Sequence, residues 1–259
     1  MEIGISTACF YPVYTEETFK IISDLGCNLC EIFLEAEHEY DKNFTALLND
    51  KMQKYNIRAK TVHAFCATFE QQLFSEYERR RYDALKVYKK VLQAAVDLGA
   101  KSYTFHGDRR CDNLDNLDFE CYVKNLNELL DIASYYDVAL SWENVAWCQT
   151  SRPEFIQRVK SAAPSLKFTL DIKQARRANV LPEEYISAMG DSLINVHVND
   201  FNGEKSCMLP GRGEYDFKKL LDRLKGIGYK GNAIIEVYSS DYNDYSELKT
   251  SMEYLKGLL

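Results

Sequence analysis

The sequence predicts an α/β fold in which eight parallel strands, each followed by a helix, close into one barrel. Three observations carry this prediction. Short apolar or β-branched runs recur eight times, and segments with helical periodicity lie between them. The 259 residues also leave about 32 per repeat, the size of one strand and its crossover helix. We therefore expect a single-domain (β/α)8 TIM barrel that spans residues 1–259.

The apolar runs define eight candidate strands. They are Ile3–Ser6, Leu29–Leu34, Ala59–His63, Ser102–His106, Val138–Glu143, Phe168–Asp171, Leu193–Val198 and Ala233–Val237. Helices are predicted over Glu17–Leu25 and Tyr82–Leu98, because each of these periodic segments is followed by a glycine that can end a helix in the left-handed conformation. The alternative, an open doubly wound sheet, would need a glycine-rich phosphate turn after its first strand, and the sequence there has none.

The composition limits where the protein is expected to reside and what it is expected to bind. The net charge of −7 opposes binding to nucleic acid, which needs a basic surface. No stretch reaches the roughly 18 apolar residues that span a bilayer, and the N-terminus does not resemble a signal peptide. Cys27 and Cys30 lack a second such pair, so we expect buried thiols in a reducing compartment. These features predict a cytoplasmic protein that binds neither membranes nor nucleic acid.

Polar side chains lie at the carboxyl ends of the last six predicted strands, where a barrel of this kind has its active site. In chain order they are His63, His106, Glu143, Asp171, His197 and Glu236. Three of the four histidines are in this set, which histidines scattered through a core would not produce. Glu31, inside the second strand, is expected to face the barrel interior as a hydrogen-bond partner. The strand ends therefore predict a catalytic mouth.

Four of these residues, from four successive strands, are expected to converge near the barrel axis: Glu143, Asp171, His197 and Glu236. Three carboxylates packed together repel one another unless a cation neutralises them. Oxygen donors with one imidazole suit a divalent metal ion; Mn²⁺ is the first expectation, with Mg²⁺, Co²⁺ or Zn²⁺ as alternatives. The competing interpretation is that each is a buried group hydrogen-bonded to a neighbour.

Short motifs follow one another along the chain at barrel spacing: Val62-His63, Phe105–Gly107, Ser141–Asn144, Leu170-Asp171, Val196–Asp200, Pro210–Phe217 and Ile235–Val237. In this order they resemble the xylose isomerase-like barrels of the sugar isomerase/epimerase superfamily. That superfamily includes ketose 3-epimerases, hydroxypyruvate isomerases, inosose isomerases and dehydratases, and apurinic endonucleases. The resemblance implies one metal ion, held by Glu143, Asp171, His197 and Glu236. It also implies that Glu143 and Glu236 move the substrate proton through an enediolate, as carboxylates beside a metal ion can.

Other residues are expected to shape a substrate site for a small ketose or keto-polyol. The set comprises His63, His106, Trp142, Lys173, Gln174 and Arg212. The histidines could instead serve only in packing or as partners of the ligands. Many relatives carry a histidine where this chain has Gln174, and the further ligands of the apurinic endonucleases are missing. The resemblance therefore disfavours DNA repair.

Three functional classes remain after this reasoning. The first is a metal-dependent sugar isomerase or epimerase, that is, an enzyme. The second is a dehydratase of an inosose or dehydroshikimate-like ring, because proton removal beside a carbonyl can also lead to loss of a β-hydroxyl group. The third is a barrel that binds sugar without catalysis, a class suggested by Gln174. Relatives often assemble, so a homo-oligomer is a further expectation.

Overall fold

The computed structural model describes residues 1–65, 67–111 and 117–259 and shows a closed barrel of eight parallel strands. The strands follow one another in chain order around the barrel, and the last pairs with the first. Their bounds are β1 Ile3–Ser6, β2 Leu29–Leu34, β3 Arg58–Ala64, β4 Ser102–Phe105, β5 Ala139–Glu143, β6 Lys167–Asp171, β7 Leu193–Val198 and β8 Asn232–Ile235. The predicted fold class is confirmed.

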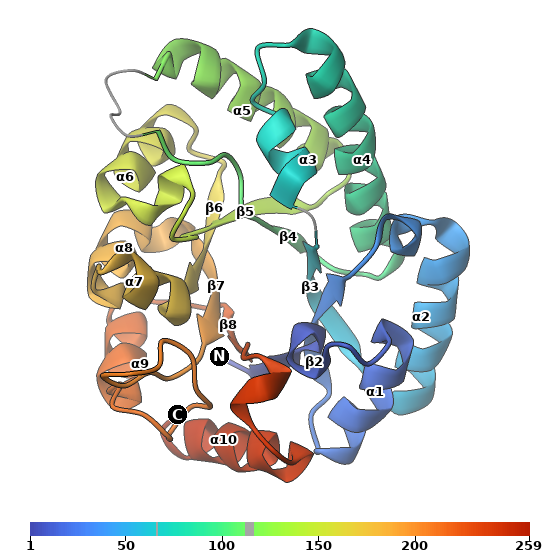
Figure 1. Ribbon diagram of the computed structural model, residues 1–259, viewed down its shortest axis with the longest axis vertical. Helices are drawn as coiled ribbons and strands as arrows, with labels where there is room; N and C mark the ends of the chain where they lie inside the picture. Colours follow the sequence, from blue (N-terminus) through green and yellow to red (C-terminus); the bar gives the residue numbers. More distant parts are fainter. Residues whose placement is uncertain (66, 112–116) are drawn as a thin grey trace.

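Helices surround the barrel (Figure 1). They are α1 Thr15–Asp24, α2 Lys42–Tyr55, α3 Ala67–Gln72, α4 Glu78–Asp97, α5 Phe119–Tyr135, α6 Pro153–Ala162, α7 Ile172–Ala178, α8 Pro182–Met189, α9 Phe217–Gly226 and α10 Tyr245–Gly257. Gly26 and Gly99, which follow α1 and α4, have φ of 76° and 71°, as predicted for helix-ending glycines. Among the described residues, no helix has the length and apolarity needed to cross a membrane.

Two predicted strand ends lie one or two residues beyond the observed strands. β4 stops at Phe105, so His106 begins the following loop. β8 stops at Ile235, although the backbone N–H of Glu236 still donates to the carbonyl of Val198 at 3.2 Å. In both cases the polar residue, His106 or Glu236, is the first residue after the strand. It still lies at the carboxyl end of the barrel.

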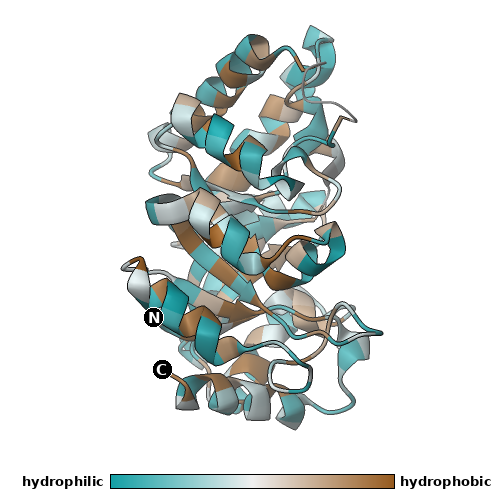
Figure 2. Cartoon of the chain, turned by 90° about the vertical axis from the view of Figure 1, so that its left-hand side faces the viewer, coloured by the Kyte–Doolittle hydropathy of each residue, from teal (hydrophilic) through white to brown (hydrophobic). Residues whose placement is uncertain are grey.

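The apolar core lies mainly between the strands and the helices. Figure 2 shows mainly hydrophobic strands inside a shell of helices whose outer faces are mainly hydrophilic. Cys27 and Cys30 are both buried, as predicted. Inside the barrel, by contrast, hydroxyl groups meet: Ser141 and Thr169 lie 2.7 Å apart, and Thr61 and Thr104 lie 3.3 Å apart. The barrel interior can therefore support a polar site above it.

Candidate metal centre

The four predicted ligands gather at the carboxyl ends of β5 to β8. Donor atoms of Glu143, Asp171, His197 and Glu236 all lie within 4.8 Å of one another, and all four residues are buried. Nδ1 of His197 is 3.4 Å from Glu143, 3.8 Å from Asp171 and 3.3 Å from Glu236. Parallel strands that end on one rim explain how residues so distant in sequence meet.

The polar atoms of this cluster fit a cation. Within the described chain, Nδ1 of His197 is buried without a hydrogen-bond partner. Oδ2 of Asp171 is buried without a hydrogen bond as well, although it lies 3.2 Å from Nζ of Lys173. Buried polar atoms normally have partners, so donor atoms without hydrogen bonds that converge on one point suit a bound cation. Oxygen donors with one imidazole match the preferences of Mn²⁺ and similar ions. The residues present therefore fit a divalent metal ion.

Glu31 lies beneath the cluster and orients His197. Its Oε1 is 3.0 Å from Nε2 of His197, while its Oε2 accepts hydrogen bonds from Asn195 at 3.1 Å and Thr104 at 3.0 Å. A carboxylate that binds one imidazole nitrogen leaves the other for a metal ion. Burial alone would lower the pKa of His197, but the carboxylates of Glu236 and Glu31 hold it well above its usual value.

His63 and His106 lie beside the two glutamates. Their Nε2 atoms are 2.7 Å apart, and Nε2 of His106 is 3.2 Å from Oε2 of Glu143. Nδ1 of His63 is 3.6 Å from Oε1 of Glu236. Burial lowers the pKa of His63, but hydrogen bonds to Glu236 and Glu31 raise it to about 10. This arrangement allows both roles considered from the sequence, contact with a substrate hydroxyl or support of the glutamates.

No sequence pattern indicated the role of Glu70. This residue of α3 is fully buried, and its Oε2 accepts hydrogen bonds from the backbone N–H groups of His106 at 2.9 Å and Gly107 at 3.2 Å. The hydroxyl of Tyr103 donates to its other oxygen. Glu70 thereby fixes the turn that carries His106. Nothing in its local sequence distinguishes it from a solvated helix residue.

A cavity of about 280 Å³ opens directly over the cluster. Its lining combines polar groups from the strand ends with an aromatic wall: Ala8, Tyr11, Phe33, Glu35, His63, Phe65, His106, Glu143, Lys173, Gln174, Glu236, Val237 and Tyr238. Of the four candidate ligands, the two glutamates line this cavity, whereas Asp171 and His197 lie outside its lining. The two glutamates are therefore the candidate ligands that are placed to touch a bound molecule.

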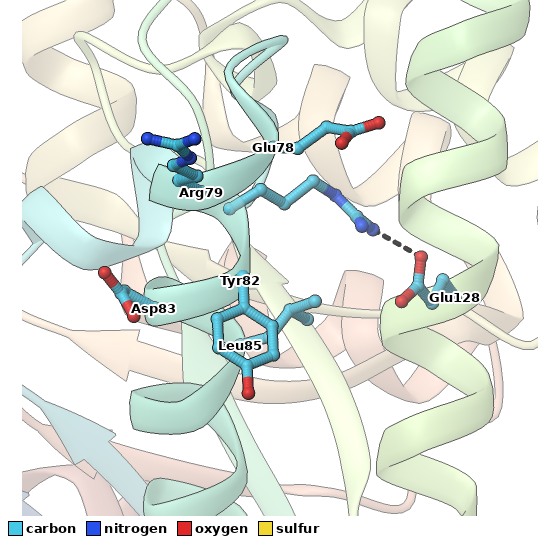
Figure 3. A pocket seen from close by; sticks show the side chains of 7 residues that line it. Glu78, Arg79, Tyr82, Asp83, Leu85 and Glu128 are labelled. Atoms are coloured by element: carbon cyan, nitrogen blue, oxygen red, sulfur yellow. Dashed lines mark hydrogen bonds and ion pairs between the residues drawn. The ribbon is translucent and has the colours of Figure 1, made fainter.

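A larger hollow of about 720 Å³ lies on the outer surface between α4 and α5 (Figure 3). There Arg81 pairs with Glu128, while Glu78, Arg79 and Asp83 point in different directions. No set of described side chains in this hollow points toward one common position where a ligand could bind. The residues that line the cavity at the strand ends, and not its volume, therefore identify it as the candidate site.

The structure leaves two predicted substrate contacts outside the cavity lining. Trp142 is fully buried, and its Nε1 donates to the carbonyl of His106 at 2.7 Å. Its indole ring packs so closely on Gly107 that a Cβ atom there would lie 2.3 Å away. Trp142 thus supports the turn of His106 from behind. We therefore leave it out of the proposed substrate site.

Arg212 is the other residue outside the lining. Its guanidinium lies 2.5 Å from the Glu247 carboxylate of α10. The carboxylate of Asp200 accepts hydrogen bonds from the backbone N–H groups of Gly211 at 3.0 Å and Gly213 at 2.8 Å, and so fixes the turn that carries Arg212. The turn directs the side chain toward the helix. Lys173 and Gln174 do line the cavity, and the Gln174 side-chain carbonyl accepts from the backbone N–H of Ala146 at 3.2 Å.

Glu35 is a cavity residue that sequence reasoning missed. It follows β2, and its backbone N–H donates to the carboxylate of Glu39 at 2.7 Å. Burial, and then repulsion from Glu39, raise the pKa of Glu35 to about 7, while His63 opposes the shift. Its position just after a strand was the signal that could have identified it.

Replacing Glu35 by Gln is expected to stabilise the protein at pH 8 but hardly at pH 4. The folded-state pKa lies above the ordinary value of 4.5, so wild-type stability falls as the pH rises from 4.5 through about 7. We expect the variant to gain about 1 kcal/mol at pH 8, allowing for solvent screening. Urea unfolding at both pH values measures this gain. An equal effect at pH 4 and pH 8, or the same gain in Glu37→Gln, would contradict the assignment.

Together, the fold and this cluster define a (β/α)8 barrel whose strand ends carry a candidate metal centre. The chain belongs to the xylose isomerase-like TIM barrels, whose family model matches residues 19–258.

Similar proteins match nearly the whole chain. An uncharacterized protein of Methanocaldococcus jannaschii is 24% identical and is aligned over 99% of this chain and 90% of its own. Among solved structures, a D-tagatose 3-epimerase-like protein superposes with a TM-score of 0.81 at 21% identity, covering 100% of this chain and 97% of its own. A probable 3-DHS dehydratase from Bacillus anthracis gives 0.79 at 12% identity, with 99% of each chain covered.

Proposed function

We propose that the protein is a metal-dependent isomerase or epimerase of a small ketose or keto-polyol. One observation carries this proposal: Glu143 and Glu236 belong both to the candidate metal cluster and to the cavity lining. A carboxylate in that position can exchange a proton with a substrate held beside the cluster. Asp171 and His197, which lie outside the lining, would serve as ligands alone. The epimerase-like structural neighbour supports the class at the level of fold.

In the proposed reaction, one glutamate removes the proton from the carbon next to the substrate carbonyl. In an isomerisation the same glutamate returns this proton to the neighbouring carbon, while the hydroxyl proton passes between the two substrate oxygens. In an epimerisation the other glutamate, which must carry a proton when the substrate binds, delivers it to the opposite face, and exchange with solvent restores both protonation states after product release. A divalent cation held by the four ligands, with Mn²⁺ the first candidate, would stabilise the negative charge that develops on the substrate oxygens. His63 and His106, both at the cavity wall, would hold substrate hydroxyl groups.

The experiment that tests this function is substrate screening in D₂O with manganese-loaded protein. Free and phosphorylated ketoses would be followed by NMR. We expect deuterium to enter next to the carbonyl, with formation of an isomer of unchanged unsaturation. An ultraviolet-absorbing conjugated enone would show a dehydratase instead. Sugar binding without exchange or conversion across the panel would favour the non-catalytic class.

Metal addition is expected to stabilise the chelator-treated protein. A ligand that binds only the folded state at about 100 times its dissociation constant adds about 2.7 kcal/mol to the free energy of unfolding. Thermal unfolding with and without Mn²⁺ measures this gain. Asp171→Asn removes one anionic ligand and should lose most of the gain, whereas a wild-type protein that does not respond to any divalent ion would contradict the proposed site.

A further inference from the structure

Lys173 holds the same carboxylate groups that a metal ion would need. It is the second residue of α7, directly after β6. Its Nζ donates to Oε2 of Glu236 at 3.0 Å and lies 3.2 Å from Oδ2 of Asp171. The side chain is buried, yet it belongs to the lining of the cavity over the cluster. An ammonium group therefore lies between two candidate ligands and the space for substrate.

The charges around Lys173 explain why its ammonium lies there. Glu31, Glu143, Asp171 and Glu236 bring four carboxyl groups into one buried cluster. Buried carboxylates need compensating charge, and Lys173 supplies it together with the imidazoles. Among the described residues, Lys173 is the one lysine or arginine that pairs with this cluster.

A divalent cation that binds the same oxygens as this ammonium group is destabilised by electrostatic repulsion. Like charges a few ångströms apart repel strongly where water is excluded. Oδ2 of Asp171 and Oε2 of Glu236 also face Nδ1 of His197, at 3.8 Å and 3.3 Å. Any cation held jointly by these three residues would therefore approach Nζ. Binding of a metal ion there would require the ammonium group to break its ion pair with at least one of the two carboxylates.

We propose that Lys173 is an internal counter-ion that competes with the divalent metal ion for Asp171 and Glu236. It holds the metal-free cluster together and weakens metal affinity. When metal enters, the ammonium is displaced toward the cavity, where it can donate a hydrogen bond to a substrate oxygen. This inference rests on the proposed metal-dependent function and adds to it an exchange between two cations.

Calorimetric titration of Mn²⁺ into chelator-treated protein tests the exchange. Lys173→Met is expected to bind Mn²⁺ at least about tenfold more tightly than wild type, because one competing positive charge is gone. Lys219→Met is the matched control; it removes an exposed lysine paired with Glu183 and should leave the affinity unchanged. Lys173→Gln provides a second, polar variant for the same comparison, and circular dichroism checks that each protein is folded.

Thermal unfolding adds a readout that does not depend on activity. Without metal, Lys173→Met should melt below wild type, because the carboxylates lose their counter-ion; with saturating Mn²⁺ its gain in melting temperature should exceed that of wild type. Equal or weaker Mn²⁺ binding by both Lys173 variants, with normal binding by wild type, would overturn this inference alone. Failure of wild type to bind any divalent ion would overturn the proposed function itself.

Discussion

Replacing Glu236 by Gln is expected to lower turnover by about 10²–10⁴-fold, the usual contribution of a general acid or base. Glutamine keeps the size of the side chain but cannot accept and return the substrate proton. Burial alone would raise the pKa of Glu236, yet the positive charges of His197 and Lys173 hold it well below its usual value, so the group is a carboxylate at neutral pH. Steady-state kinetics and deuterium exchange on the substrate found by screening measure the loss.

The control for Glu236→Gln is Glu204→Gln, which alters an exposed glutamate in the loop after β7. This variant should retain wild-type turnover. Glu143→Gln should resemble Glu236→Gln, because the proposed reaction uses both glutamates for proton transfer. Turnover within about threefold of wild type in a folded, metal-loaded Glu236→Gln protein would remove Glu236 from the chemistry. Comparison with the loss of metal affinity separates proton transfer from ligation.

Replacing Glu31 by Ala is expected to cost about 3–5 kcal/mol of stability, the range for removal of one partner from a buried ion pair. The variant would leave His63 and His197 without a shared carboxylate, and the donors of Asn195 and Thr104 without an acceptor. Urea unfolding of the metal-free protein measures the change. Glu253→Ala, on the exposed face of α10, should have little effect.

The Glu31 effect should also depend on pH in a defined direction. Burial raises the pKa of Glu31, but His197 and the other groups around it lower it below 4.5 overall. Stability from such a group is present above the unfolded-state pKa and is lost as the pH falls through the folded-state pKa. The difference between wild type and Glu31→Ala should therefore shrink as the pH falls below 4.5. A constant difference from pH 7 to pH 3 would show that packing, and not charge, dominates.

The barrel and the strand-end cluster could be predicted from the sequence because both follow from the spacing of the strands along the chain. Parallel strands deliver their last residues to one rim, so Glu143 and Asp171 could be placed together without knowing any loop. The direction of a loop side chain does not follow from spacing, because contacts with distant segments determine it. Arg212 turns toward Glu247 because Asp200 fixes its loop, and no local pattern encodes that contact.

Supporting residues were harder to predict for a related reason. Glu70 is buried because a short helix lies over Tyr103 and the turn after β4, a packing arrangement that the local sequence does not reveal. Trp142 was expected at the cavity because it precedes Glu143, but adjacent residues of a strand point to opposite sides. The alternation that puts Glu143 toward the barrel axis puts Trp142 toward the helices.

Anomalous scattering from crystals grown with Mn²⁺ tests the central claim most directly. We expect one strong peak at the ends of β5 to β8, within bonding distance of Glu143, Asp171, His197 and Glu236, and its loss in Asp171→Asn. Absence of a peak at this position at saturating Mn²⁺, or a peak held only by surface carboxylates, would contradict the metal centre and the chemistry built on it.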